Sequence, residues 1–285
     1  MKKSSLPRKK ITVPMTKNDH LISPEIIATH NDYLVINKPA GLAVHGGGNL
    51  REKTLADWLL ANYPELSTVG EDSARPGIVH RLDKEVSGLM VVAKNNNSFF
   101  SLKDQFKQRS VIKEYLALVH GRIENDQGVI NFSIVRSRDG YRMAALPAGT
   151  ENLLSRHQPR QRDQGNIDAW FKARPAETEF SVLTRFINYT LLRVQIKTGR
   201  THQIRVHFFA LGHPLVGDQL YGSKTFQAKN QKINLGRIWL LADRLSFSDL
   251  KGGRQSFSLP IPSDLLFFHP DKKSLPEKID SGFDL

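Results

Sequence analysis

The sequence of 285 residues contains no cysteine. Disulfide bonds and thiolate metal ligands are therefore excluded, and a reducing compartment is expected. No apolar run approaches the roughly 20 residues needed to cross a bilayer, and the N-terminal lysines lack the apolar stretch of a secretory signal. Gly46–Gly48 match neither common phosphate-binding glycine pattern, so they indicate a flexible turn. We therefore expect a cytoplasmic protein with no membrane segment.

Acidic residues are few relative to basic ones, with 28 Asp and Glu against 41 Lys and Arg, which gives a formal charge of +13. Such an excess favours a polyanionic partner, most often nucleic acid, although a basic protein that is merely soluble has the same composition. Residues 1–22 are predicted to be a basic flexible tail and residues 271–285 a disordered one. The 39% hydrophobic content suffices for a core, which we expect in one domain over residues 23–270.

The chain is organised around residues 75–94. A short apolar step, Ile78 and Val79, and the run Leu89–Ala93 predict buried strands, because both are short and bounded by glycine or proline. His80, Arg81, Asp83 and Lys84 lie on the connection. Neighbouring cations hold an aspartate ionised and available as a nucleophile or base. Local spacing fits equally well a loop salt bridge that ties two strands together.

Several stretches resemble one family. His80–Leu89 resembles the His-Arg-Leu-Asp…Ser-Gly-Leu motif of the RluA-type RNA pseudouridine synthases, and Thr198–His207 resembles their Thr-Gly-Arg-x-His-Gln-Ile/Leu-Arg-x-His motif. Asn37–His45, Lys113–Gly121 and Leu211–Gly222 are similar to three further stretches of the family. Together the matches cover about residues 25–260.

One departure from the family pattern is Val86, where the family usually has threonine. This change alters a hydroxyl near the loop and leaves Asp83 in place. The resemblance implies that Asp83 is the catalytic residue, that Tyr115 packs on the target base, and that Arg205 pairs with Asp83. Without the motif, a tyrosine in a strand indicates a core residue; with it, a flat ring and a reaching hydroxyl suit base stacking.

Further residues of these motifs are expected to bind RNA. Flipping a paired uridine out of its stack costs a few kcal/mol. The resemblance implies that Arg81 fills the space that the uridine vacates. The others share polarity and closeness to the motif loops: His80, Lys84, Arg200, His202 and Gln203. The reaction that the resemblance implies, isomerisation of uridine to pseudouridine, is neither an oxidation nor a hydrolysis, so no cofactor or metal is expected. His202, His207 and His213 lack the four-residue spacing of a helical metal pair, which argues against a metal site.

The sequence predicts an α+β fold, a mixed, largely antiparallel sheet with flanking helices and loops and a central active-site cleft. The resemblance implies the same fold. A hairpin is expected over residues 26–36 and paired strands over 176–185 and 189–197; Trp239–Ala242 and Leu245–Phe247 are expected to be closing strands. Thr54 is a predicted N-cap, and residues 97–109 a helix with Phe99, Phe100, Leu102 and Phe106 inward.

A helix is also expected after the N-cap Thr201, with Ile204, Phe208 and Leu211 on one face and Gly212 at its end. Residues 136–175 are rich in arginine with little periodicity. We predict a long exposed excursion that contacts RNA phosphates.

The predicted function is isomerisation of specific uridines to pseudouridine in structured RNA. Large-subunit ribosomal RNA is favoured, because residues 75–84 look most like the ribosomal branch. Many relatives carry an S4 RNA-binding domain before the catalytic one, and the catalytic pattern here begins near Ser23, so we expect none. That expectation favours the alternative substrate, tRNA. The sequence leaves two other functional classes open. One is a glycosidic-bond hydrolase, which usually needs a second carboxylate. The other is a catalytically silent RNA-binding module. A monomer is expected.

Overall fold

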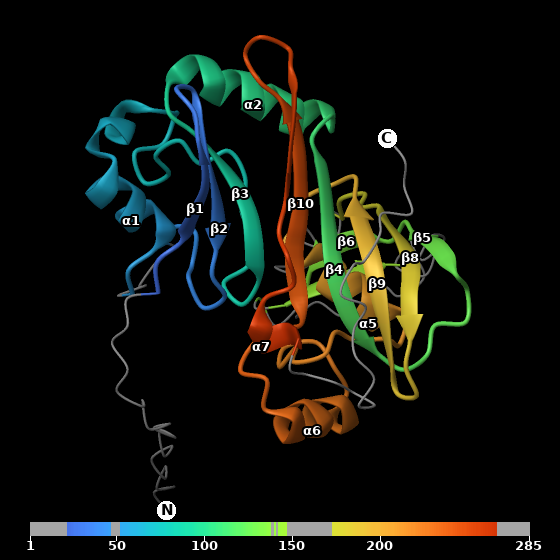
Figure 1. The fold of residues 1–285 in the computed structure, drawn as a ribbon. Coiled ribbons are helices and arrows are strands. Elements are labelled where there is room, and N and C mark those ends of the chain that lie inside the picture. The colour runs from blue at the N-terminus through green and yellow to red at the C-terminus, as the bar shows by residue number, and fades with distance from the viewer. Residues whose placement is uncertain (1–21, 47–51, 138–139, 141, 147–172, 267–285) are drawn as a thin grey trace, which may run out of the picture.

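The computed structural model describes residues 22–46, 52–137, 140, 142–146 and 173–266 (Figure 1). The helices are α1 (Leu55–Asn62), the 3₁₀ helix η1 (Pro64–Thr68), α2 (Asn96–Gln108), α5 (Gln203–Ala210), α6 (Lys224–Ile233) and α7 (Ser263–Leu266). The strands are β1 (Glu25–Thr29), β2 (Tyr33–Lys38), β3 (Ser87–Ala93), β4 (Ile112–His120), β5 (Gln127–Ile130), β6 (Ser133–Arg136), β7 (Met143–Leu146), β8 (Thr178–Arg185), β9 (Tyr189–Ile196), β10 (Leu240–Ser248) and β11 (Arg254–Ser258). Within these ranges, no helix is long and apolar enough to cross a membrane.

Within the part of the chain that the structure describes, one nine-stranded sheet runs in the order β1-β2-β3-β10-β4-β9-β8-β5, with β11 paired to β10. In this sheet β3 and β10 are parallel, and the other described pairs are antiparallel. Strands β6 and β7 form a separate two-stranded sheet. The prediction of an α+β fold with a mixed, largely antiparallel sheet is confirmed.

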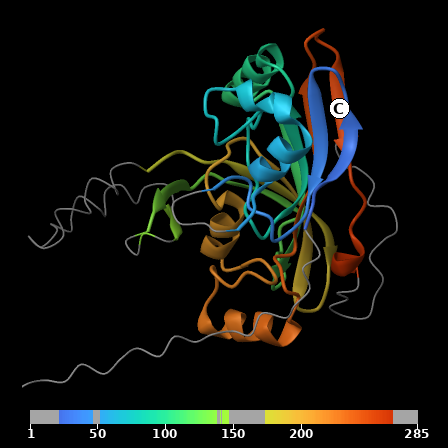
Figure 2. The ribbon, with the colours of Figure 1, turned by 90° about the vertical axis from the view of Figure 1, so that its left-hand side faces the viewer.

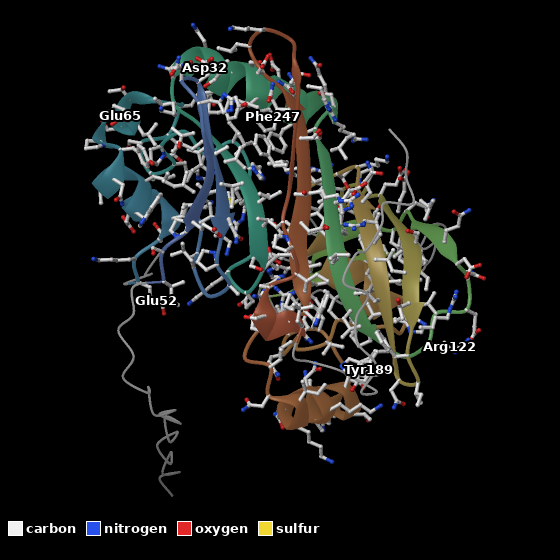
Figure 3. All side chains as sticks on the ribbon, viewed as in Figure 1. Asp32, Glu52, Glu65, Arg122, Tyr189 and Phe247 are labelled. Carbon is white, nitrogen blue, oxygen red and sulfur yellow. The ribbon has the colours of Figure 1, made fainter. Side chains whose placement is uncertain are left out.

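The helices α1, α2 and α5 lie on one face of the large sheet (Figure 2). Helix α1 starts where the sequence predicts, because Thr54 and Asp57 form a reciprocal capping box. Every residue of β3 is buried, as expected for a strand covered on both sides. Helix α2 crosses the end of β10 near the buried Phe247 (Figure 3), and Gln105 bonds to Ser248 there.

The centre of the sheet is a narrow seam. Strands β3 and β10 share two residue pairs, Leu241 with Ser87 and Ala242 with Gly88. Gly88 has a φ of +130°, and a Cβ placed there would lie 2.3 Å from the Ala242 carbonyl oxygen. Only glycine therefore allows the two backbones to approach this closely. The loop that carries Asp83 enters β3 at this seam.

Several local predictions are wrong. Ile78 and Val79 do not form a strand; Ile78 makes a single bridge to Val92. The two closing strands are one, β10, whose register shifts between Leu241 and Arg244, so its alternation breaks without ending the strand. Phe100 is 49% exposed, although the other predicted inward residues of α2 are buried or half-buried.

Helix α5 also begins differently from the prediction. Its N-cap is His202, in the left-handed conformation and without a side-chain cap, so Thr201 is not the cap. Ile204 and Phe208 are buried as expected, whereas Leu211 is 37% exposed because the helix ends before it. Much of the predicted excursion 136–175, most of the tail 1–22 and all of 271–285 lie outside the described residues.

The seam gives a stability test. We expect Gly88→Ala to destabilise the fold by about 3 kcal/mol or more, since both φ and the contact with Ala242 oppose a Cβ. Gly212→Ala is the matched control, because Gly212 also has a positive φ (+83°) with nothing within 4 Å of its Cβ position. It should cost only about 1 kcal/mol in urea unfolding. Equal losses in the two variants would contradict the seam argument.

Candidate active site

Residues from distant parts of the chain line one pocket at the seam. Its lining includes Arg81 and Asp83 from the loop before β3, Tyr115 from β4, and Arg200, His202 and Arg205 from the segment leading into α5. Leu240 at the start of β10 closes it. The structure thus brings together the three predicted catalytic residues and four of the six predicted RNA-binding residues, Arg81, Arg200, His202 and Gln203.

Arg205 is the charged centre of this pocket and is 3% exposed. Its Nε and Nη2 donate to Oδ2 and Oδ1 of Asp218 at 2.8 and 3.0 Å, a bidentate pair. Its Nη1 donates to Oδ2 of Asp83 at 3.2 Å, and Glu85 lies 3.6 Å away. Burial lowers the pKa of Arg205, but the hydrogen bonds and charge of Asp218 and the charge of Asp83 raise it above its usual value overall. Arg205 is therefore a fixed cation that orients Asp83.

Asp218 is itself held rigidly. Its Oδ1 accepts the backbone N–H groups of Leu220 and Tyr221, and its own carbonyl accepts from the side chain of the buried Asn230. These contacts fix the carboxylate before Arg205 binds it, so little freedom is lost when the pair forms. The anchoring chain from Asn230 through Asp218 and Arg205 ends at Asp83.

His202 approaches Asp83 from the other side. Its Nε2 lies 3.9 Å from Oδ2 of Asp83, and its Nδ1 is 2.8 Å from the Tyr221 hydroxyl. That hydroxyl accepts the N–H of Met143 on β7 at 2.7 Å. The hydroxyl keeps its own hydrogen for donation to Nδ1, and the tautomer that accepts this bond has its ring hydrogen on Nε2, facing Asp83. Burial lowers the pKa of His202, which favours the neutral ring that this arrangement needs.

Tyr115 is 6% exposed and lies in the pocket wall. Burial and the charge of Asp83 raise the pKa of its hydroxyl above the usual value. The phenol therefore stays protonated near neutral pH, and it can donate a hydrogen bond while its ring offers a flat apolar face.

His80, Lys84 and the pocket residue Gln203 make contacts within the fold. The His80 ring stacks on Phe106, and its Nε2 accepts the N–H of Val91. Gln203 is buried, and its amide bonds to Thr198, Arg200, Glu177 and Thr178. Lys84 forms an exposed ion pair with Glu52. These contacts give His80 and Gln203 a structural role; binding of RNA by these three residues stays a prediction.

Sequence reasoning assigned no role to Lys38, which is fully buried. Its Nζ donates to the carbonyls of Pro39 and Leu42 at 2.8 Å and to that of Lys84 at 3.3 Å. The ammonium therefore ties the loop after β2 to the loop that carries Asp83. Burial lowers the pKa of Lys38 to about 7, against the charge of Asp83. A lysine at the end of an apolar strand, directly before proline, was the available signal.

Asp218 and Tyr221 belong to the stretch Leu211–Gly222, but nothing in the sequence indicates what their side chains contact. The described residues contain no group of three or more His, Asp or Glu placed to hold a metal ion. The absence of a metal remains a prediction.

Comparison with known proteins gives concordant results. A family model described as RNA pseudouridylate synthase matches residues 32–210. An uncharacterized RNA pseudouridine synthase of Chloroflexus aurantiacus is 42% identical over 231 residues, which are 80% of this chain and 63% of the relative. The ribosomal large subunit pseudouridine synthase D of Nitrosomonas europaea is 36% identical over 276 residues, covering 94% and 72% of the two chains.

Among solved structures, the human RNA pseudouridylate synthase domain containing 1 has a TM-score of 0.64 and 27% identity, with 87% of each chain covered. The chain spans 63% of the length of the relatives from Chloroflexus aurantiacus and Aquifex aeolicus. The matched region contains Asp83, Tyr115 and Arg205, but Asp218 and β10 follow it in the sequence.

The anchoring of Arg205 predicts a contrast between its two partners. Asp218→Asn should cost about 3–5 kcal/mol in urea unfolding, because it leaves a buried guanidinium without its bidentate anion. Asp83→Asn should change the stability by less than about 1 kcal/mol, because Asp83 is half-buried and makes one bond to Arg205. If the two variants are equally destabilised, Asp218 is not the anchor.

The buried imidazoles predict an acid-sensitive fold. Burial, with a contribution from Lys113, lowers the pKa of His80 to about 3, and burial lowers that of His207 to about 4. In the unfolded chain both titrate near 6.5, so between these values the unfolded state binds more protons. The free energy of unfolding should therefore fall as pH drops from about 6.5 towards 3.

His80→Gln removes one of these two titrations and keeps an acceptor in the chain. Its stability should fall less steeply over that pH window than that of the wild type in urea titrations. A curve parallel to that of the wild type would show that His80 does not contribute.

Proposed function

The chain belongs to the RNA pseudouridylate synthase family, and from this premise we propose that it isomerises specific uridines in RNA to pseudouridine. The bond between C1′ of the ribose and N1 of uracil breaks, the base turns, and C1′ bonds to C5. The proton lost from C5 balances the proton gained at N1, so the reaction needs no oxidant, reductant or water. The observation that carries the proposal is the ion pair of Asp83 with the buried Arg205 inside a pocket walled by Tyr115.

In this proposal each pocket residue has a distinct task. Asp83 acts on the nucleotide, by attack on the ribose or the base or by removal of a ribose proton. Arg205 keeps its carboxylate charged and oriented, and a site that closes around the nucleotide strengthens this interaction by excluding water. Tyr115 stacks on the uracil, and its protonated hydroxyl is available as a donor. The exposed Arg81 fills the space that the uridine leaves.

Large-subunit ribosomal RNA is the proposed substrate. The supporting observations are the printed names of several relatives, ribosomal large subunit pseudouridine synthases C and D, which are 33–36% identical to this chain. The proposal includes a cytoplasmic monomer that needs no cofactor, and tRNA is the competing substrate.

The test is pseudouridine mapping in total RNA from cells that lack the gene, by carbodiimide-dependent stops of reverse transcription. One or a few stops should vanish and return with the wild-type protein but not with Asp83→Asn. This variant is the matched negative control, since it keeps the size of the side chain and removes its charge. The position of the lost stops separates ribosomal RNA from tRNA.

A purified-protein assay decides the reaction class. Single-turnover incubation with the mapped RNA should yield pseudouridine and no free uracil. Release of uracil would instead identify a glycosidic-bond hydrolase, and RNA binding without any product would identify a catalytically silent module. Either result would overturn the proposal.

A further inference from the structure

Two cationic residues line the pocket and three more lie close to Arg200 or to its neighbour Gly199: Arg81, Arg109, Lys113, Arg174 and Arg200. We refer to them as the rim cluster. They come from the loop before β3, the C-cap of α2, the start of β4, the residue that bridges to β6, and the loop before α5. Arg81 and Arg200 line the pocket itself, and the other three extend the charge outward.

Neighbouring residues relate the members of the rim cluster to one another, and the Arg81 guanidinium itself lies 3.5 Å from Nε2 of His45. Beside Arg81, the His80 ring stacks on Phe106 at 4.6 Å, and the Lys113 ammonium lies 5.5 Å from the centre of the same ring. A Cβ at Gly199 would be 3.9 Å from the Lys113 nitrogen, which places Lys113 next to Arg200.

The outer members are held in the same way. Arg200 donates to the carbonyl of Pro175, the neighbour of Arg174, at 3.2 Å. Arg109 caps α2 directly after the turn that contains Phe106, with its backbone N–H bonded to that turn. Burial lowers the pKa of Arg200, and the charges of Arg174 and Arg109 lower it further, as expected of neighbouring cations.

No carboxylate among the described residues forms an ion pair with a member of the rim cluster. Several cations elsewhere are paired, as in Arg185 with Asp126 and Lys197 with Glu179. Gathering like charges without counter-charges disfavours the folded state. The repulsion between these cations in the free protein is relieved when an anion binds among them, which favours an anion-binding role for the cluster.

We propose that the rim cluster binds the RNA backbone as a phosphate track, holding the phosphodiesters that flank the uridine in the pocket. This inference deepens the proposed function and rests on RNA being the substrate. A guanidinium binds phosphate in a bidentate manner, and an ammonium adds a point charge. The track makes no base contacts of its own, so it positions the RNA and leaves sequence selection to other contacts.

The geometry favours RNA backbone over an acidic protein segment. Two members of the cluster, Arg81 and Arg200, line the cavity that would receive the flipped nucleotide. The phosphates on either side of that nucleotide must therefore pass over this rim. Three members, Arg81, Arg109 and Arg174, are exposed and reach solvent without a change in the fold.

The test uses Arg109→Gln and Arg174→Gln, which remove exposed charges outside the pocket, each in the Asp83→Asn background so that binding is measured without turnover. The probe is a short RNA stem-loop that contains the mapped uridine. Each variant should bind about three- to tenfold more weakly, and the slope of log K against log salt should fall by about 1 per lost phosphate contact. The melting temperature should stay constant or rise, because a repulsion has been removed.

Arg122→Gln is the matched control. It removes one exposed cation at the far end of β4 (Figure 3), where Arg122 pairs with Glu124. Its affinity and salt slope should equal those of the parent protein. If the rim variants behave like Arg122→Gln, or if they lose affinity only together with melting temperature, the phosphate track is wrong.

Neutral methylphosphonate linkages on either side of the uridine identify the contacted phosphate. When the methylphosphonate replaces the phosphate that Arg109 or Arg174 contacts, adding Arg109→Gln or Arg174→Gln should lower the RNA affinity no further, because both changes remove the same contact. Fully additive losses at every linkage would overturn the assignment. In the active background, a high KM with an unchanged kcat supports the track. Wild-type protein that binds the stem-loop through the rim but forms no pseudouridine would contradict the proposed function alone.

Discussion

A buried guanidinium between two carboxylates determines how the rest of this protein is arranged. Arg205 needs partners for several donors, and desolvation makes any unmet donor costly. Asp218 satisfies two of them, and the backbone around Leu220 and Tyr221 fixes Asp218 in turn. The Nη1 group of Arg205 donates to Asp83, which is 122 residues away in the sequence. The position of the Asp83 carboxylate is thus influenced by the Arg205–Asp218 pair, to which it does not belong.

The contact between Arg205 and Asp83 lies beside the shortest strand pairing of the large sheet, that of β3 with β10. Strands β3 and β10 share two residue pairs at the centre, so the loop before β3 has room to present Asp83 to the pocket. That loop is then secured from behind by Lys38, whose ammonium bonds to carbonyls on both loops. Rigid support from a buried charge compensates for the few hydrogen bonds that the seam provides. The site combines an open approach for a polymer with a fixed carboxylate.

The sequence was sufficient for what depends on periodicity and on local chemistry. Alternating strands and the Thr54 cap could be predicted because these signals are short-range. Asp83, Tyr115 and Arg205 were predicted from the family resemblance, since local spacing alone left a loop salt bridge and a core tyrosine as equally good or better interpretations. The roles of Lys38, Asp218 and Tyr221 could not, since they depend on which carbonyls and rings lie nearby in space. The start of α5 was misplaced for a similar reason: His202 adopts a left-handed backbone in contact with Tyr221, which no residue-type preference predicts.

The position of β10 in the chain also matters when the protein is made. One half of the sheet, β1-β2-β3, is complete by residue 93 and is built from sequential antiparallel neighbours; the strands of the other half, β4-β9-β8-β5, are complete by residue 196. Strand β10 is synthesised later and pairs with both β3 and β4. Because it also contributes Leu240 to the pocket, a nascent chain on the ribosome has two half-sheets and no finished site. The pocket is therefore completed only after the central strand has joined the halves.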